Sequence, residues 1–94
     1  MKKLEKYYKN GYDLTLIHRE EDLAIALGKS RLTGRDNWEV IKVQSHNGIQ
    51  MGENWVEACE YNPSNKKWGI QGWTAMNEKE AWKIFNNKNP NAVS

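Results

Sequence analysis

The chain has 94 residues, with 14 Lys and Arg against 12 Asp and Glu and one cysteine. This length fits a single domain. One cysteine excludes an internal disulfide and a multi-cysteine zinc site, and it fits a reducing cytoplasm. No apolar run approaches the ~20 residues of a membrane span, and the basic start MKKLEKYYKN lacks the apolar core of a signal peptide. The net charge of +2 permits an anionic partner without requiring one.

The sequence predicts three segments along the chain. Residues 1–11 are expected to form a basic, solvated N-terminal arm, with one short amphipathic helical turn as the alternative. Residues 12–86 are predicted to form a single α+β domain. Residues 87–94 are expected to be a disordered C-terminal tail, because Pro90 cannot continue a helix.

The first strand is predicted over residues 12–19, where polar and apolar residues alternate. The alternation places Tyr12, Leu14, Leu16 and His18 on one face and the intervening residues on the other. The charged run EED then breaks the strand.

The next segment, LAIAL at residues 23–27, fits two structures. As a strand it would place its larger side chains on one face and its alanines on the other. The longer stretch EEDLAIALG also fits a two-turn helix that is acidic at its start and ends at Gly28. We favour the strand, because a hairpin would bring it beside the first strand.

The middle of the chain predicts two further strands, over residues 38–44 and 55–61, both rich in β-formers. A polar loop is expected over residues 29–37 and another loop over residues 49–54. The dipeptide Asn-Gly at positions 47–48 predicts a turn between the strands.

The stretch from Trp68 to Phe85, WGIQGWTAMNEKEAWKIF, predicts a strand, a cap and a helix. The strand would place Trp73 on the face opposite to Trp68. Asn77 can accept a hydrogen bond from the first helical turn, and Glu80 follows three residues later. The whole order predicts an α+β fold: a four- to five-stranded antiparallel meander sheet with one C-terminal helix packed on one face.

Metal and catalytic motifs are weak in this sequence. His18, His46 and Cys59 lie far apart, with no ligand pair at helix or knuckle spacing. Cys59 and His46 could form a thiolate pair, but no motif supports such a pair. A lone cysteine on a strand is more often a small buried apolar residue than a nucleophile. Glu57 and Glu60 fall on opposite faces of one strand and make a poor acid–base pair. We therefore predict no catalytic residue, no metal, no cofactor and no enzymatic activity.

Tryptophan points to a binding surface. The chain holds five Trp, and such side chains are seldom fully enclosed, so some should line a pocket or a subunit contact. Cations beside an aromatic ring can hold a phosphate while a base stacks on the ring. The alternative is that the cations lie in solvated loops and the Trp side chains form the core, with no binding surface. The candidate ligand-binding residues are Arg31, Arg35, Lys66, Lys67, Trp68, Trp73 and Trp38.

Three patterns carry a resemblance to a known group of proteins: a DLAI strand, a WEV strand, and a WG…WT strand that leads into a helix with an aromatic residue near its end. On these patterns residues 12–86 resemble small uncharacterised bacteriophage accessory proteins. The resemblance implies a phage protein made in the bacterial cytoplasm. Such a protein would counter host defence, either by sequestering a nucleotide-like signal as a sponge or by masking a host protein as an inhibitor. The matching positions are Asp22 to Ile25, Trp38 to Val40, Trp68, Gly69, Trp73, Thr74, Trp82 and Phe85.

The sequence therefore predicts a non-enzymatic binding protein for an anionic, nucleotide-like ligand or a host protein. We expect a homo-oligomer, joined by a sheet edge or by the apolar helix face, and no membrane partner. The alternative is a small nucleic-acid-binding protein that uses the Lys-rich arm and loops, with an affinity that falls steeply with salt. A third hypothesis is a small hydrolase that uses Cys59 or His46.

Overall fold

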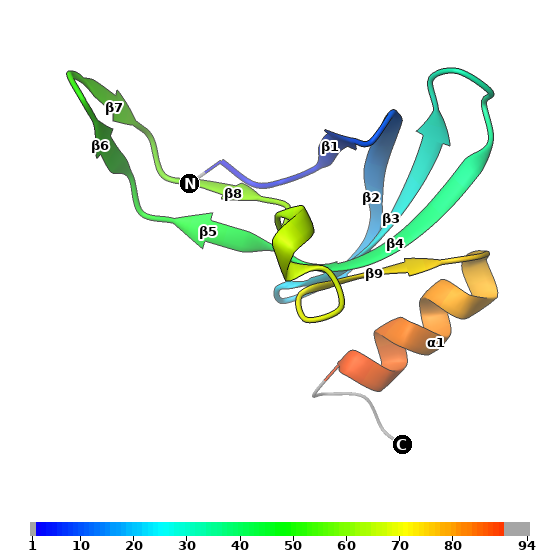
Figure 1. The fold of residues 1–94 in the computed structure, drawn as a ribbon. Coiled ribbons are helices and arrows are strands. Elements are labelled where there is room, and N and C mark those ends of the chain that lie inside the picture. The colour runs from blue at the N-terminus through cyan, green and yellow to red at the C-terminus, as the bar shows by residue number, and fades with distance from the viewer. Residues whose placement is uncertain (1, 90–94) are drawn as a thin grey trace.

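The computed structural model describes residues 2–89 and confirms the α+β class (Figure 1). Five antiparallel strands form one sheet in the order β1-β2-β3-β4-β9, and α1 packs on β3, β4 and β9. Two short pairs, β5 with β8 and β6 with β7, lie outside this sheet. In chain order the elements are β1 (Lys6–Lys9), β2 (Tyr12–Glu20), β3 (Leu23–Ser30), β4 (Asp36–Lys42), β5 (Gln44–His46), β6 (Ile49–Met51), β7 (Asn54–Val56), β8 (Cys59–Tyr61), the 3-10 turn η1 (Asn65–Lys67), β9 (Gly72–Ala75) and α1 (Glu78–Lys88).

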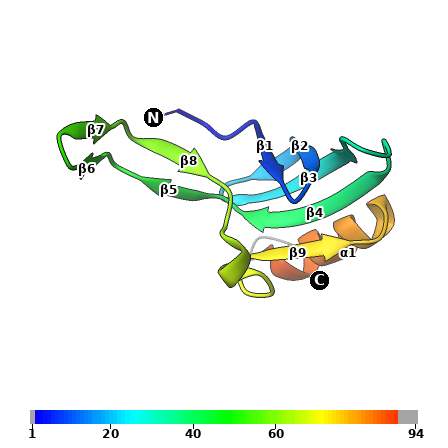
Figure 2. The same ribbon diagram turned by 45° about the horizontal axis from the view of Figure 1, so that its top comes forward.

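The alternation along the central strands decides which side chains meet the helix. β3 and β4 pair with Ile25 opposite Val40 and Ala24 opposite Ile41. Paired residues share a face, so Ile25 and Val40 lie on one side and Ala24 and Ile41 on the other. α1 covers the first side, which we call the helix face (Figure 2). We call the second side the open face.

Large apolar side chains fill the helix face. Ile25 and Val40 are fully buried against Phe85 of α1, which is 1% exposed. The predicted cap is confirmed, since the Asn77 side chain accepts a hydrogen bond from the Glu80 N–H at 2.9 Å. A helix of 11 residues is marginal alone in water, so its packing on the sheet stabilises it.

A β-bulge in β2 moves half of this strand to the other face. The register with β3 shifts between Leu16 and His18. Leu16 packs on the open face, whereas the His18 ring lies 4.7 Å from the ring of Trp82 on the helix face. The prediction that His18 shares a face with Tyr12 and Leu14 is therefore wrong, because the extra residue of a bulge reverses the alternation.

Residues 44–61 form an arm that projects from one end of the sheet (Figures 1 and 2), and we call it the ribbon. At its base the Arg19 guanidinium donates to both carboxylate oxygens of Glu60, at 2.6 and 2.7 Å. These bonds, with a further one from the Leu4 N–H, lower the pKa of Glu60 to about 2 although burial opposes them. The pair fastens the ribbon to β2.

The N-terminal segment differs from the predicted solvated arm. Lys6–Lys9 is β1, which pairs with β2, and Lys2 forms a parallel bridge with Cys59 in the ribbon. Asn10 and Gly11 form the turn before β2, with positive φ values of 50° and 86°. An Asn-Gly pair tolerates this conformation and is a strong hairpin signal. The sequence therefore contained a signal for a strand before residue 10, although the Lys-rich composition favoured a solvated arm.

The middle of the chain confirms one prediction and corrects others. Residues 23–27 are strand, within β3. The strand predicted over residues 55–61 is wrong, because it is divided between β7 and β8 and lies outside the main sheet. The loop predicted over residues 49–54 contains β6. The ribbon turns at residues 52–53, whereas residues 47–48 only bend the strand between β5 and β6.

The C-terminal part of the structure also differs from the prediction in two places. Trp68 follows η1 and precedes β9, so the predicted strand through Trp68 and Ile70 is wrong, and Ile70 is 70% exposed. α1 extends to Lys88, into the tail predicted over residues 87–94. Residues 90–94 of that tail lie outside the described residues. Within residues 2–89 no helix has the length and apolar character of a bilayer crossing.

Candidate functional site

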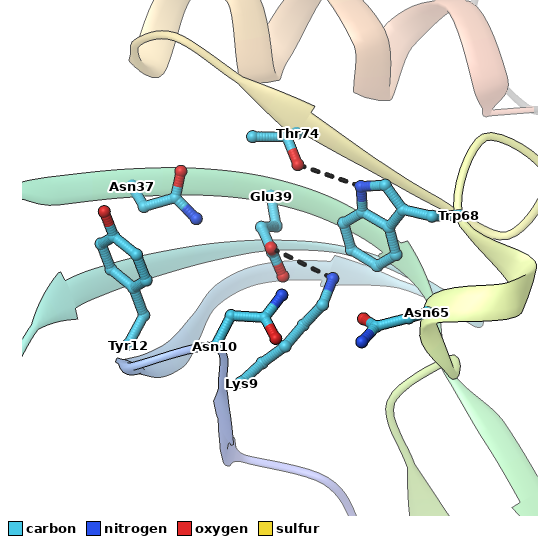
Figure 3. A pocket seen from close by; sticks show the side chains of 8 residues that line it. All are labelled: Lys9, Asn10, Tyr12, Asn37, Glu39, Asn65, Trp68 and Thr74. Atoms are coloured by element: carbon cyan, nitrogen blue, oxygen red, sulfur yellow. Dashed lines mark hydrogen bonds and ion pairs between the residues drawn. The ribbon is translucent and has the colours of Figure 1, made fainter.

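A cavity of about 370 Å³ opens on the open face of the sheet, and we call it the concave pocket (Figure 3). Cavities that hold small molecules have volumes of about 300–1,000 Å³, so the pocket is large enough for a compact ligand. Its side chains come from the first β-hairpin, from β4 and β9, and from the segment around η1. They are Lys9, Asn10, Tyr12, Asn37, Glu39, Asn65, Trp68 and Thr74.

The floor of the concave pocket is a buried acid. Glu39 lies on β4 between Trp38 and Val40, which face the helix, so its side chain must face the pocket. It is 4% exposed and is the one charged residue among residues 2–89 that is buried. The Tyr7 hydroxyl donates to Glu39 Oε1 at 2.7 Å, and Lys9 Nζ donates to Oε2 at 3.4 Å.

Burial shifts the titration of both donors. Burial raises the pKa of Tyr7, and the Glu39 carboxylate raises it further. Burial also lowers the pKa of Lys9, and Glu39 opposes that shift in part. Tyr7 is therefore a fixed hydrogen-bond donor at neutral pH, whereas Lys9 is held in the pocket with less hydration than a surface lysine has.

One wall of the pocket is the indole of Trp68. Its Nε1 donates to Thr74 Oγ1 at 3.0 Å, and Lys9 Nζ lies 2.9 Å from the ring centroid. The ring also lies against the backbone of Gly72, where a Cβ would come within 2.2 Å of it. The absence of a side chain at Gly72 lets the ring pack onto the sheet, and the Thr74 bond fixes its orientation.

The rim of the pocket is rich in amide groups. The side chains of Asn10, Asn37 and Asn65 have no hydrogen-bond partner within residues 2–89, and each offers a donor and an acceptor. Tyr12 adds an aromatic ring and a hydroxyl on the same side (Figure 3). A floor with a paired acid and base, an aromatic wall and an amide rim can recognise a flat polar ligand through its edge and its face.

The candidate ligand-binding residues from the sequence do not form one site. Trp68 lines the concave pocket, and Lys66 and Lys67 lie in η1 beside it, exposed to solvent. Trp38 and Trp73 pack on the helix face, where Trp73 Nε1 donates to the Gly69 carbonyl at 3.2 Å. The assignment of these residues to a ligand stays a prediction.

The two arginines of the candidate set lie near the far end of the β3–β4 hairpin. Arg31 donates to both carboxylate oxygens of Asp13 at 2.8 Å, and its guanidinium lies 4.1 Å from the Tyr8 ring centroid. Arg35 is exposed in the same loop. Arg31 therefore already has an anionic partner in the fold.

Most residues of the concave pocket were not among the candidates predicted from the sequence. Two signals in the sequence pointed to the concave pocket. The Asn10-Gly11 turn indicates that the residues before it form a strand, and Glu39 must face away from Trp38 and Val40 if residues 38–40 are a strand. The missed lining residues are Lys9, Asn10, Tyr12, Asn37, Glu39, Asn65 and Thr74.

The structure brings Cys59 and His46 together in the ribbon, where Cys59 Sγ lies 3.1 Å from His46 Nε2. The Gly48 N–H donates to His46 Nδ1 at 3.2 Å, so in the neutral ring the proton lies on Nε2 and points at the sulfur. No carboxylate bonds to this histidine within residues 2–89. The pair lacks the third group that orients the base in a nucleophilic triad.

The described residues, 2–89, contain no cluster of three or more His, Cys, Asp or Glu side chains that could hold a metal ion. Comparison of the chain with protein-family models, with curated proteins and with solved structures finds no significant match.

Proposed function

We propose that the protein is a non-enzymatic binding protein that holds a nucleotide-like ligand in the concave pocket. The observation that carries this proposal is the buried Glu39–Lys9 pair beside the Trp68 ring, at the bottom of a cavity of about 370 Å³. In the phage context implied by the resemblance, such a protein would act in the bacterial cytoplasm and sequester a signal used by host defence.

The pocket has the features that a nucleotide needs. Amide side chains at its rim match the donor and acceptor edges of a base, and the aromatic wall offers a face for stacking. Lys66 and Lys67 are exposed and form no ion pair within residues 2–89, and they follow Asn65 of the rim directly. They are placed to attract a phosphate group attached to a base in the pocket.

A binding screen tests this proposal. Cyclic mono- and dinucleotides, nucleoside 5′-monophosphates and ADP-ribose would be tested for an increase in melting temperature, and hits would be measured by calorimetry. Asn37→Ala and Asn65→Ala should weaken a hit about fivefold or more, because each loses a hydrogen bond. Asn47→Ala, a matched change in the exposed ribbon, should leave affinity unchanged. A panel with no hit would contradict the proposal.

The ribbon supports a second candidate function, the masking of a host protein. Ile49, Met51 and Trp55 are 44%, 61% and 56% exposed, and exposed apolar side chains grouped on one element are typical of a protein contact. The ribbon carries no Lys or Arg, and of its three acids Glu60 is paired with Arg19, which leaves Glu53 and Glu57 exposed. It therefore fits a basic surface, on a host protein or on a second copy of this chain.

Solution mass tests the second-copy version of this contact. Native mass spectrometry of the wild type at low and high salt should show an oligomer that dissociates as salt rises, because the charges attract across the contact. Met51→Ser with Trp55→Ser should give a folded monomer, since both side chains are exposed and lie outside the main sheet. A wild type that is monomeric at all salt concentrations would remove the homo-oligomer.

Nucleic-acid binding through Lys2, Lys3, Lys6, Lys9, Lys66 and Lys67 is the alternative function. Lys9 lies in the pocket and donates to Glu39, so it is not available for a phosphate backbone in this arrangement. A gel shift whose affinity falls steeply with salt would support this alternative, and no shift at low salt would remove it.

A further inference from the structure

We propose that the concave pocket selects a flat ring with two adjacent N–H donors, the edge that guanine presents, and that this ring enters by displacing the Lys9 ammonium. This inference rests on the proposed function, since it names the class of base that the same pocket takes. Three observations carry it: the place that Lys9 occupies, the free acceptor capacity of Glu39, and the balance of charges after displacement.

Lys9 occupies the place where a base would stack. Its ammonium lies 2.9 Å from the centroid of the Trp68 ring, closer than the usual separation of two stacked rings. The indole cannot turn to offer another position, because Thr74 holds its Nε1 and Gly72 lies against the ring. A ligand that stacks on Trp68 must therefore remove Lys9 from the ring.

Glu39 then becomes the acceptor for the ligand edge. A carboxylate offers about four lone-pair positions, and in the structure one is used by Tyr7 and one by Lys9. When Lys9 leaves, the buried carboxylate needs donors in its place, because an unsatisfied buried charge is strongly unfavourable. Two parallel N–H groups on one edge of a ring match a carboxylate best.

Among the common bases this edge belongs to guanine, whose ring N1–H lies beside its exocyclic amine. Adenine and cytosine place an unprotonated ring nitrogen beside the amine, and its lone pair would face the carboxylate. Uracil offers a single N–H between two carbonyl oxygens. A bidentate contact of this kind discriminates by about 1–3 kcal/mol, which is roughly 5- to 150-fold in affinity.

The exchange leaves every charge with a partner if the ligand carries a phosphate. Lys9 gives up the Glu39 carboxylate and can pair with the ligand phosphate, beside Lys66 and Lys67 of the neighbouring turn. Burial lowers the pKa of Lys9 where it lies now, so a return of the ammonium to water offsets part of the cost of leaving Glu39. A guanidinium ligand such as agmatine could also bond to Glu39, but it would leave Lys9 without an anion.

Calorimetry on the full chain with guanosine, GMP, IMP, AMP and agmatine tests this inference. GMP should bind tightest, AMP about 10- to 100-fold more weakly, and IMP in between, because IMP keeps the ring N–H and lacks the amine. Glu39→Gln should remove the preference for GMP over AMP, since an amide in place of the carboxylate presents one donor to the donor edge.

Lys9→Ala tests the displacement itself. In the wild type GMP should bind more tightly than guanosine, because Lys9 pairs with the phosphate. In Lys9→Ala this gap in affinity should narrow to the part that Lys66 and Lys67 supply, and guanosine should bind several-fold more tightly than it does to the wild type. Lys79→Ala, an exposed change on α1 behind the sheet, should leave all these affinities unchanged.

The outcomes separate the two proposals. If no ligand of this set and no nucleotide of the wider panel binds, the proposed function fails and this inference with it. If nucleotides bind but AMP or agmatine equals GMP, or if the preference survives in Glu39→Gln, the guanine edge is wrong and the proposed function stands. Should Glu39→Gln fail to fold, the wild-type order of GMP, IMP and AMP decides whether the pocket reads the guanine edge.

Discussion

The two faces of the five-stranded sheet are built from alternate residues of the same strands. One is covered by α1, whereas the other holds a cavity beside a second, smaller core cluster of Ala24, Ile41 and Val43. On β3 the helix face receives Leu23 and Ile25, while the open face receives Ala24 and Ala26. The large side chains meet α1 and exclude water. The small ones leave space above the sheet, and Tyr7 and Trp68 cover that space only in part.

Polar chemistry follows the same division. On β4 the helix face has Trp38 and Val40, and the open face has Glu39. A buried carboxylate is tolerated there because β1, although two strands separate it from β4 in the sheet, brings a hydroxyl and an ammonium to it. The larger core cluster therefore lies on the helix face, whereas the buried polar groups lie on the open face.

The largest effect should come from breaking the helix face. Phe85→Ala removes a side chain that is 1% exposed in the core cluster, and we expect a loss of about 3–5 kcal/mol in the free energy of unfolding. Chemical denaturation followed by tryptophan fluorescence measures this loss. Met76→Ala, at a residue that is 92% exposed, is the control and should change stability by less than about 0.5 kcal/mol. Similar losses in both variants would contradict the division between faces.

Filling the open face should have a smaller effect. Gly72→Ala places a methyl group where the Trp68 ring now lies, within 2.2 Å of it. We expect a loss of roughly 1–3 kcal/mol and a weaker response to any ligand of the concave pocket, because the indole wall must move. Denaturation and the nucleotide screen measure the two effects. An unchanged Trp68 environment in this variant would show that the close packing is not as described.

Removing the ammonium partner of the buried Glu39 carboxylate should destabilise the fold as much as Gly72→Ala does, or slightly less. Lys9→Met leaves the Glu39 carboxylate with Tyr7 as its remaining hydrogen-bond donor, and we expect a loss of about 1–2 kcal/mol at pH 7. Adding Glu39→Gln removes the unpaired charge, so the double variant should recover part of the loss. Strictly additive losses in this double-mutant cycle would mean that the two side chains do not interact.

The smallest effect concerns the contact between ribbon and sheet. The pKa of Glu60 is about 2 in the fold, below its ordinary value of 4.5, so the unfolded chain binds more protons between these values. The contribution of Glu60 is therefore complete above about pH 4.5 and is lost as the pH falls towards 2. Glu60→Gln should lose about 1 kcal/mol at pH 7.

Melting temperature against pH measures that contribution. At pH 7 the Glu60→Gln variant should melt about 4–8 °C below the wild type, and the gap should narrow as the pH approaches 2. Glu57→Gln, at an exposed acid of the ribbon, is the matched control and should follow the wild type. A gap that is independent of pH would show that Glu60 acts through packing and not through its charge.

Much of the fold could be predicted because its signals are local. The Asn77 cap and the alternation in residues 12–19 and 38–44 each depend on neighbouring residues only, and β2, β4 and α1 lie where those patterns predict. Two of the errors came where a single residue or a two-residue turn changes the outcome. The bulge before His18 reversed a face, and the Asn10-Gly11 turn converted a basic arm into a strand.

The candidate site was predicted only in part. Trp68 was identified from its ring and its neighbouring lysines, and it does line the concave pocket. Lys9 was interpreted as one charge of a solvated arm, and Glu39 only as part of a strand. Local sequence could not assign either side chain to a pocket, because Lys9 and Glu39 form the site only by contacting each other across 30 residues of chain.

The sequence by itself determined the α+β class, the capped helix and the strands with clear alternation, because neighbouring residues fix backbone conformation and the side of a strand on which each side chain lies. Only the tertiary structure decided the pocket. Lys9 and Glu39 are 30 residues apart, and they meet because β1 folds back beside β2 and the sheet carries both to its open face. The turn at η1 then brings Trp68 over them. A site made of residues so distant in the chain exists only once strand order and curvature place them together.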